Sequence, residues 1–335
     1  MSDISFFSSS SYIFLPTKNN QKVALCIDNL KFAKNAFKLY NPFSKKAKVF
    51  KSASKFLFIT LNIFSKLLST KKEKSDFVLY LEELLNQPLI ISLYFATAND
   101  KVVLQLQSPD AQIIGYLKYP VSEIGLAHIQ NEIKAFEILS KVGISEPYLL
   151  TDNYADKPFL LLKELDGTID RVEKESVKSI LKSFEKESSY VLSEHPRVQE
   201  LKKQLLSNGM TNYITKLENI CDSSSTNYKI VYEHGDFTPW NIVKVKDKYI
   251  PFDFEYFVED GLEYFDIIKY YYQIGKLLEA KAGEGLYAFV KEQVSIPEFS
   301  ELFELFLVKE IVKQSEEGEA FIFEENMLKA VIKEI

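Results

Sequence analysis

Four polar side chains lie close together in the sequence, and they are His234, Asp236, Asn241 and Asp253. Phosphoryl transfer needs one carboxylate that orients or deprotonates the attacking hydroxyl. It also needs a second carboxylate and an amide oxygen that hold Mg²⁺ against the ATP phosphates. The order H-x-D-x-x-x-x-N, followed by Asp-Phe, therefore predicts Asp236 as catalytic base and Asn241 and Asp253 as metal ligands. The alternative is that Asp236 caps a turn and Asp253 ends a strand.

A β-hairpin is the element that must position these residues. Residues 242–245 and 249–254 have alternating side chains, and the polar residues 246–248 separate the two segments. This pattern predicts two paired strands joined by a turn. Because a hairpin brings its outer ends together, we expect Asp236 and Asn241 to lie close to Asp253.

The pattern resembles the catalytic segment of protein kinases in spacing but not in letters. His234-Gly235-Asp236 replaces the His-Arg-Asp of protein kinases, and Asp253-Phe254-Glu255 replaces their Asp-Phe-Gly. In these forms the chain is similar to the aminoglycoside phosphotransferase/choline kinase family. The resemblance covers about residues 76–280.

The resemblance implies an α+β fold of the bilobal protein kinase-like type, with a small antiparallel-sheet lobe and a larger, mainly helical lobe. It implies ATP and Mg²⁺ as cofactors and a small molecule as the hydroxyl acceptor. It further implies that His234 and Asp266 support the catalytic loop and are not themselves the base.

A lysine on a predicted strand precedes a glutamate on a predicted helix. Residues 113–119 form the expected strand and contain Lys118, while residues 123–142 have helical periodicity and contain Glu132. The resemblance implies that Lys118 contacts the α- and β-phosphates of ATP and that Glu132 holds it. Glu137 is the competing partner on the same helix.

The expected adenine site follows the buried strand 159–162. The resemblance makes the next residues a hinge between lobes whose backbone binds adenine, and it places Glu164 and Leu165 there. The expected phosphate-covering loop joins strands 89–96 and 102–107, but no glycine occurs between Leu89 and Ile114. Residues 98–100 are the candidates for its tip.

The length of 335 residues accommodates a large core and more than one domain. We expect a basic N-terminal extension at 1–75, a small nucleotide-binding lobe at 76–163 and a large catalytic and acceptor-binding lobe at 164–335. No apolar run reaches the length of about 18 residues that a membrane span requires. The absence of a basic segment before the first apolar residues argues against a secretion signal. Cys26 and Cys221 have no nearby partner, which favours a reduced, cytoplasmic protein.

Charge is distributed unevenly along the chain. Residues 1–74 have a balance of +11, and since the whole chain has a net charge of −6, the remainder has −17. The lysines of residues 43–74 surround an apolar section, as in helices that lie on an anionic membrane surface. A weak contact with the inner membrane face is one interpretation, and a helix packed on the core with solvated lysines is the other. The acidic total and the lack of a recognised motif argue against nucleic-acid binding.

The acceptor is the least determined part of the prediction. The segment after Asp253 holds four carboxylates, which favour a cationic acceptor such as an amino sugar or amino alcohol, or else are solvated. A looser similarity to family members associated with bacterial surface polysaccharides implies a sugar or glycolipid acceptor instead. The sequence thus predicts an ATP- and Mg²⁺-dependent small-molecule kinase. The alternatives are a catalytically silent nucleotide-binding scaffold and a peripheral membrane adaptor.

Overall fold

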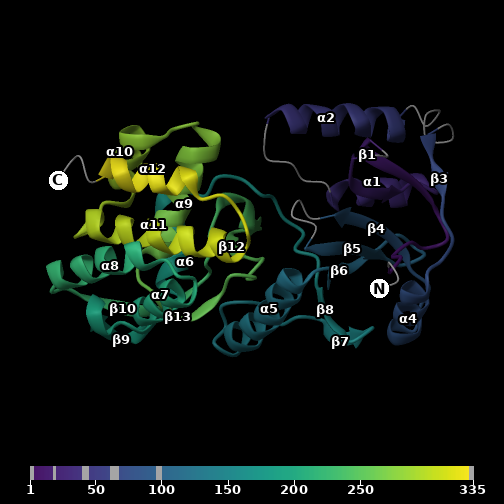
Figure 1. Ribbon diagram of the computed structural model, residues 1–335. Helices are drawn as coiled ribbons and strands as arrows, with labels where there is room; N and C mark the ends of the chain where they lie inside the picture. The colour runs from purple at the N-terminus through teal and green to yellow at the C-terminus, as the bar shows by residue number, and fades with distance from the viewer. Residues whose placement is uncertain (1–3, 18–19, 40–44, 61–67, 96–99, 332–335) are drawn as a thin grey trace. The chain divides into compact units, whose positions relative to one another are not determined.

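The structure is a computed structural model, and it describes residues 4–17, 20–39, 45–60, 68–95 and 100–331. The chain divides into two compact units (Figure 1). The sheet unit comprises the chain up to Lys134 together with Glu146–Asp166. The helical unit comprises Ala135–Ser145 and the chain from Gly167 onward. Helix α5 (Glu123–Lys141) begins in the sheet unit and ends in the helical unit.

One eight-stranded sheet organises the sheet unit, in the order β3-β1-β2-β4-β5-β6-β8-β7. Every neighbouring pair in it is antiparallel, which confirms the predicted antiparallel-sheet lobe. Its strands are β1 (Ser11–Thr17), β2 (Asn20–Cys26), β3 (Thr70–Lys71), β4 (Ile90–Phe95), β5 (Lys101–Gln107), β6 (Ile113–Pro120), β7 (Leu150–Tyr154) and β8 (Lys157–Leu162).

The N-terminal strands belong to this same sheet. Strand β2 pairs with β4 through Val23 opposite Tyr94 and Ala24 opposite Leu93. The expected extension at 1–75 therefore shares its sheet and its compact unit with the strands that follow residue 76. Sequence reasoning treated the two parts separately because the pairing of β2 with β4 joins segments about 70 residues apart, a distance at which periodicity gives no information.

Helices α1 (Leu30–Leu39) and α4 (Asp76–Leu85) bury different sets of strand residues. Asn29 begins α1, since its side-chain oxygen accepts the backbone N–H groups of Lys31 and Phe32 at 2.9 and 3.0 Å. The side chain of Asn35 on α1 donates to Gln107 on β5 at 3.0 Å, so a polar face of β5 is satisfied under this helix. Helix α4 packs Phe77, Val78 and Leu81 into the apolar cluster that also holds Leu104 and Leu106.

Most helices of the chain lie in the helical unit (Figure 1). They are α6 (Lys174–Lys182), α7 (Pro196–Ser207), α8 (Thr211–Ser223), α9 (Phe265–Gln273), η4 (Ile274–Leu278), α10 (Gly283–Val294), α11 (Phe299–Glu316) and α12 (Ile322–Val331). Strands β9 (Glu185–Val191), β10 (Asn227–Glu233) and β13 (Val258–Leu262) form a three-stranded sheet, and β11 (Ile242–Val245) with β12 (Lys248–Pro251) forms a hairpin.

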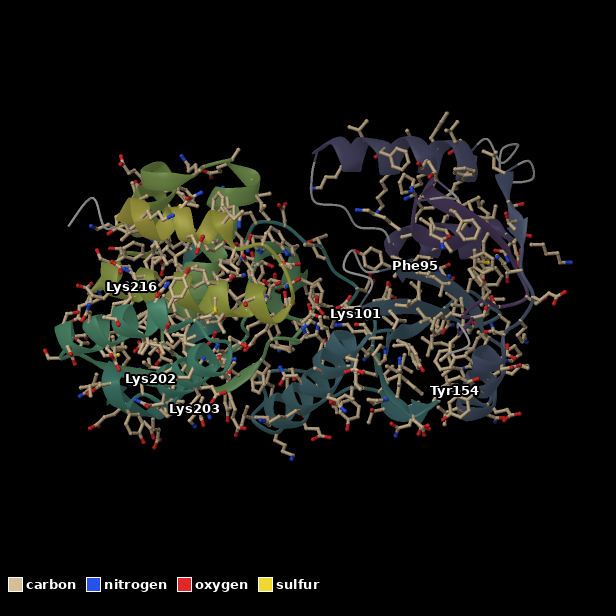
Figure 2. All side chains as sticks on the ribbon, in the orientation of Figure 1. Phe95, Lys101, Tyr154, Lys202, Lys203 and Lys216 are labelled. Atoms are coloured by element: carbon tan, nitrogen blue, oxygen red, sulfur yellow. The ribbon has the colours of Figure 1, made fainter. Side chains whose placement is uncertain are left out.

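Helix α11 lies at the centre of this unit. It contacts α7, α8, α9 and α12, and its residues are buried almost without interruption from Phe299 to Val312. That buried stretch includes charged residues, and one of them, Glu304, pairs with Lys216. Lys216 lies on α8 (Figure 2). A buried charge needs a partner of opposite charge, so these residues show where ion pairs lie within the apolar core.

Two predicted helices differ from the observed elements. Helical periodicity in the sequence predicts one helix over residues 176–192 and another over residues 196–221. The first ends as α6 at Lys182, and β9 follows it because residues 185–191 pair with β10. The helix expected at 196–221 is divided into α7 and α8 at Gly209, whose φ of 66° does not fit a helix. Tertiary pairing and a left-handed glycine decided these two cases, and helical periodicity detects neither.

Within the described residues, none of the helices combines the length and the apolar character needed to cross a membrane. The two cysteines are free thiols buried in different units. Burial raises the pKa of Cys26 and of Cys221 to about 11, so both are thiols at neutral pH.

Candidate active site

The predicted hairpin is present and its two ends meet, but its second strand ends at Pro251 and not at Phe254 as predicted. In the pairing of β11 with β12, Ile242 lies opposite Pro251. The next residue after Pro251, Phe252, donates its backbone N–H to the carbonyl oxygen of Asn241 at 3.0 Å. Asp253 therefore follows directly on a residue that is hydrogen-bonded to Asn241. The φ of Asp253 is 67°, a left-handed conformation in which Asp is tolerated better than most residues.

Asn241 is oriented by Asp236. Its amide nitrogen donates to the backbone carbonyl and to Oδ2 of Asp236, both at 3.0 Å. This commits the nitrogen to Asp236, so the amide oxygen is the atom that Asn241 offers to a metal ion. The single turn η3 (Pro239–Asn241) places the two side chains next to each other. An amide oxygen and a nearby carboxylate are ligands that suit Mg²⁺, although the roles of Asn241 and Asp253 stay predictions.

His234 links the loop to the hairpin. Its ring is fully buried, with Nε2 at 3.0 Å from the carbonyl oxygen of Phe252 and Nδ1 accepting the N–H of Asp236 at 3.4 Å. These partners assign the proton to Nε2. Burial lowers the pKa of His234, so the ring is neutral. A neutral imidazole with both nitrogens engaged on backbone groups supports the loop and cannot act as the base.

Asp266, the second residue of α9, holds the loop from the other side. Its two carboxylate oxygens accept the N–H groups of His234 at 2.7 Å and of Gly235 at 3.0 Å. Burial, reinforced by the nearby charge of Glu233, raises the pKa of Asp266 to about 7. Gly235 has a φ of 77°, and a Cβ at this position would collide with the carbonyl oxygen of Tyr256. The glycine of the H-G-D pattern is therefore required by the backbone.

Sequence reasoning missed a buried lysine beside Asp236. Lys269 on α9 is 3% exposed, and its Nζ lies 2.6 Å from Oε2 of Glu310 on α11 and 3.4 Å from Oδ1 of Asp236. Burial alone lowers the pKa of Lys269, but the charges of Glu310 and Asp236 together raise it above its usual value. A positive charge is thus fixed against the predicted base. The signal was available, since Lys269 and Glu310 each interrupt an apolar run.

The network continues away from Asp236. Lys309 Nζ lies 3.1 Å from Oε1 of Glu310 and 3.3 Å from Oε1 of Glu233, and Arg197 Nε lies 3.3 Å from Oε2 of Glu233. Burial alone would raise the pKa of Glu310, but the neighbouring lysines hold it well below its usual range. Three cations and three carboxylates, counting Lys269 and Asp236, therefore neutralise one another in the core of the helical unit.

In the sheet unit, Lys118 and Glu132 form a buried pair. Lys118 Nζ lies 2.6 and 2.7 Å from the two carboxylate oxygens of Glu132. Glu132 is fully buried and the Lys118 side chain is 9% exposed. The structure therefore gives Lys118 to Glu132, whereas Glu137 is an exposed residue. Whether the lysine contacts ATP phosphates stays a prediction.

The predicted hinge residues follow β8 at the end of the sheet unit. Glu164 and Leu165 are half-buried, and the chain enters the helical unit two residues later, at Gly167. Glu164 accepts the ammonium group of Lys38 on α1 at 2.9 Å. The carboxylate of Glu164 is thus engaged by a lysine, and the adenine contact of the backbone of Glu164 and Leu165 stays a prediction.

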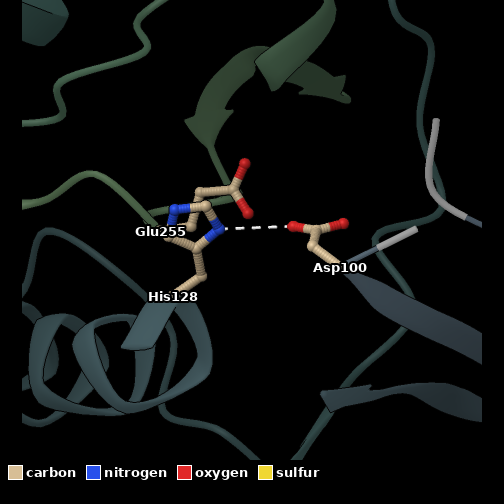
Figure 3. Close-up of side chains that lie close together, drawn as sticks. All are labelled: Asp100, His128 and Glu255. Atoms are coloured by element: carbon tan, nitrogen blue, oxygen red, sulfur yellow. Dashed lines mark hydrogen bonds and ion pairs between the residues drawn. The ribbon is translucent and has the colours of Figure 1, made fainter. Parts of the chain in front are cut away.

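The loop predicted to cover the phosphates lies between Phe95 and Lys101 (Figure 2). Residues 98 and 99 lie outside the described residues. Asp100 is described. Its carbonyl oxygen accepts the N–H of Val121, two residues before α5, at 2.8 Å, and its Oδ2 lies 3.3 Å from Nδ1 of His128 on α5 (Figure 3). Asp100 therefore fixes one end of the loop to the helix that carries Glu132.

The sequence was compared with family models and with curated proteins, and the structure was compared with solved structures. No family model matches the sequence, and no curated protein matches it significantly. Among solved structures, a thermostable mutant of aminoglycoside phosphotransferase APH(4)-Ia is similar with a TM-score of 0.52 and 8% identity, over 77% of this chain and 98% of that chain.

Two further solved structures are a macrolide 2′-phosphotransferase from Brachybacterium faecium and an ethanolamine kinase from Plasmodium vivax. The first has a TM-score of 0.49 and 12% identity, over 76% of this chain and 98% of that chain. The second has a TM-score of 0.45 and 12% identity, over 91% of this chain and 94% of that chain. By their names, these three solved structures are two phosphotransferases and one kinase. The chain has the bilobal kinase-like fold.

Proposed function

We propose that this protein is an ATP- and Mg²⁺-dependent phosphotransferase that transfers the γ-phosphate to a hydroxyl group of a small molecule. One observation carries the proposal. The loop with Asp236 and Asn241 and the hairpin end before Asp253 are joined through the Phe252–Asn241 hydrogen bond and through His234. The residues Asp236, Asn241 and Asp253, whose side chains carry the oxygen atoms that phosphoryl transfer requires, thereby belong to segments joined by backbone hydrogen bonds.

In this proposal Asp236 accepts the proton of the attacking hydroxyl and orients it. The amide oxygen of Asn241 and the carboxylate of Asp253 hold Mg²⁺, which when bound neutralises charge on the phosphates. Lys269, fixed by Glu310, keeps Asp236 in place through the contact of its ammonium group with Oδ1. The neutral His234 and the carboxylate of Asp266 hold the backbone of the loop, so their contribution is positioning.

In the sheet unit we assign ATP contacts to Lys118, which Glu132 orients, and to the backbone of Glu164 and Leu165. The bidentate pairing fixes the ammonium group of Lys118 at the end of a buried side chain. A lysine held in this way acts as a point charge for phosphate oxygens. We expect the protein to work in the cytoplasm, where ATP is available and free thiols persist.

The acidic segment after Asp253 gives less support to a cationic acceptor than its composition suggested. Part of it forms β13, which pairs with β10. Asp260 pairs with Lys186 at 2.9 Å, and Glu263 accepts the N–H of Lys229 at 2.9 Å. Asp260 and Glu263, two of the four carboxylates, therefore have partners in the helical unit. Amino sugars, amino alcohols and sugars or glycolipids all stay within the proposed acceptor class.

The first experiment measures Mg²⁺-dependent ATP consumption by the wild type and by Asp236→Asn against a panel of these acceptors. We expect one acceptor class to be phosphorylated, and we expect the variant to lose at least about 100-fold in kcat with similar ATP binding. Failure of the wild type to bind ATP in the presence of Mg²⁺ would refute the kinase proposal. ATP binding without turnover on any acceptor, unchanged by Asp236→Asn, would favour a nucleotide-binding scaffold.

A further inference from the structure

Helix α2 (Lys45–Lys55) and the π-helix η1 (Phe56–Thr60) that follows it expose apolar side chains on the surface of the sheet unit. One side of this segment packs inward: Phe58 and Ile59 contact the apolar cluster built by β1, β2 and α1, and Ser54 is 5% exposed. The segment is thus anchored to the unit through this side. A surface helix anchored in this way normally presents polar residues on its other side.

The other side is apolar instead. Val49 is 70% exposed, Phe56 54%, Phe50 38% and Leu57 38%. Val49 and Phe56 are seven residues apart and so are Phe50 and Leu57, so at about 100° per residue the four side chains form one stripe. Scattered exposed apolar residues are normal, but a continuous stripe that includes two phenylalanines marks a surface that binds something.

Lysines accompany this stripe. Lys48 and Lys55 are exposed, and Lys51 is half-buried, with burial and the neighbouring Lys55 lowering its pKa. No acidic residue occurs between Asp28 and Glu73, whereas this stretch contains 11 lysines. Lys38 is paired with Glu164. The partner of this surface must therefore be both apolar and negatively charged.

We propose that the α2 face, defined as Val49, Phe50, Phe56 and Leu57 with Lys48 and Lys55, binds an anionic phospholipid membrane surface. The segment would lie in the plane of the interface, with the apolar side chains at the boundary of headgroups and acyl chains and the lysines at lipid phosphates. No helix of the described residues is suited to span a membrane, so this contact is peripheral.

Other partners fit the α2 face less well. Two copies that paired through this same α2 face would bring like charges together, since residues 29–72 contain no carboxylate to offset them. Nucleic acid would use the lysines but would leave the apolar stripe in water. A membrane with anionic headgroups satisfies both parts of the surface.

The experiment is sedimentation of the full chain with vesicles of phosphatidylcholine, with and without phosphatidylserine. We expect binding only with phosphatidylserine, and weaker binding as salt shortens the Debye length from about 10 Å at 0.1 M to about 3 Å at 1 M. The charge variant Lys48→Gln/Lys55→Gln should bind at least about tenfold more weakly. The apolar variant Val49→Ser/Phe56→Ser should also lose roughly tenfold or more.

The matched control is Lys203→Gln/Leu206→Ser on α7, where Leu206 is 56% exposed and Lys203 is exposed. It removes the same kinds of side chain from another exposed helix and should bind like the wild type. Circular dichroism and thermal unfolding establish that all variants keep the fold. The assay needs neither ATP nor an acceptor, so its failure leaves the proposed kinase activity unaffected.

Three results would overturn the proposal. They are no sedimentation of the wild type with phosphatidylserine vesicles, equal sedimentation of wild type and both α2-face variants, and equal sedimentation with and without phosphatidylserine. A concentration-dependent dimer in light scattering that the apolar variant abolishes, without vesicle binding by the wild type, would assign the α2 face to a second copy of the chain instead.

Discussion

Lys269 Nζ lies 3.4 Å from Oδ1 of Asp236, so a buried cation contacts the carboxylate proposed as catalytic base. The same ammonium group lies 2.6 Å from Glu310, which is 3% exposed. The base is therefore not an isolated side chain on a loop. It is one end of a charge network that extends from α9 to α11 into the core of the helical unit.

We expect Lys269→Met to destabilise the protein by about 3–5 kcal/mol, because Glu310 and Asp236 lose their shared cation. The double variant Lys269→Met/Glu310→Gln should recover part of this stability, because the buried carboxylate of Glu310 is replaced by a neutral amide. The free energy of unfolding in urea is measured for the wild type, Lys269→Met, Glu310→Gln and the double variant, and the four values form a double-mutant cycle. Additive effects would show that Lys269 and Glu310 do not depend on each other.

The variant Lys269→Arg tests the role of Lys269 in catalysis apart from its role in stability. This variant keeps the charge but not the position of the ammonium group beside Asp236. We expect kcat to fall by roughly 100-fold while the KM for ATP stays within about twofold, because the base is misplaced and ATP contacts are not. A change confined to the KM would contradict a positioning role for Lys269.

Lys118→Met should remove ATP binding, because the proposed phosphate contact is lost. It should also destabilise the sheet unit, because fully buried Glu132 is left without Lys118. The expected loss of stability is about 3–5 kcal/mol. In Lys118→Met/Glu132→Leu much of this stability should return, because both charges are replaced by apolar groups. ATP affinity, measured by calorimetry with Mg²⁺, should stay lost in the double variant. Recovery of ATP affinity together with stability would show that Lys118 is structural only.

The sequence was sufficient for the elements that carry local signals. The hairpin was predicted from alternation in residues 242–254, although its second strand ends at Pro251. The pair of Lys118 and Glu132 was implied by the resemblance to the kinase-like family. The features that the sequence did not predict depend on contacts between segments that are distant in the chain. Strand β9 exists because it pairs with β10, and the approach of Lys269 to Asp236 requires α9, α11 and the catalytic loop to be packed together.

The amino-acid type at position 235 is set by the backbone, and substitution tests this directly. Gly235→Ala should cost at least about 2 kcal/mol, because the residue has a φ of 77° and the new Cβ would meet the Tyr256 carbonyl oxygen. Gly209→Ala is the matched control, since its φ is 66° but a Cβ there meets nothing. It should cost only about 1 kcal/mol. Equal losses in thermal unfolding would mean that the contact with Tyr256 is unimportant.

The buried ring of His234 should make stability depend on acid pH. Burial lowers its pKa in the folded state, so above the unfolded pKa of about 6.5 the ring is neutral in both states. As the pH falls below 6.5, the unfolded chain takes up a proton that the folded protein does not. This proton uptake lowers the free energy of unfolding by up to about 1.4 kcal/mol per pH unit. His195 has a pKa lowered by the same cause and acts in the same direction.

Asp266 acts in the opposite direction, because its pKa is raised to about 7 and its neutral form favours the folded state as the pH falls. The test therefore compares His234→Gln with the wild type at each pH instead of reading one profile. A glutamine amide can still donate to the Phe252 carbonyl but does not titrate. The stability difference between the two proteins should shrink as the pH falls from 6.5 towards 5, at up to about 1.4 kcal/mol per unit. A difference that stays constant over this range would mean that His234 is protonated in the folded protein, and the neutral loop support inferred from its two backbone hydrogen bonds would be wrong.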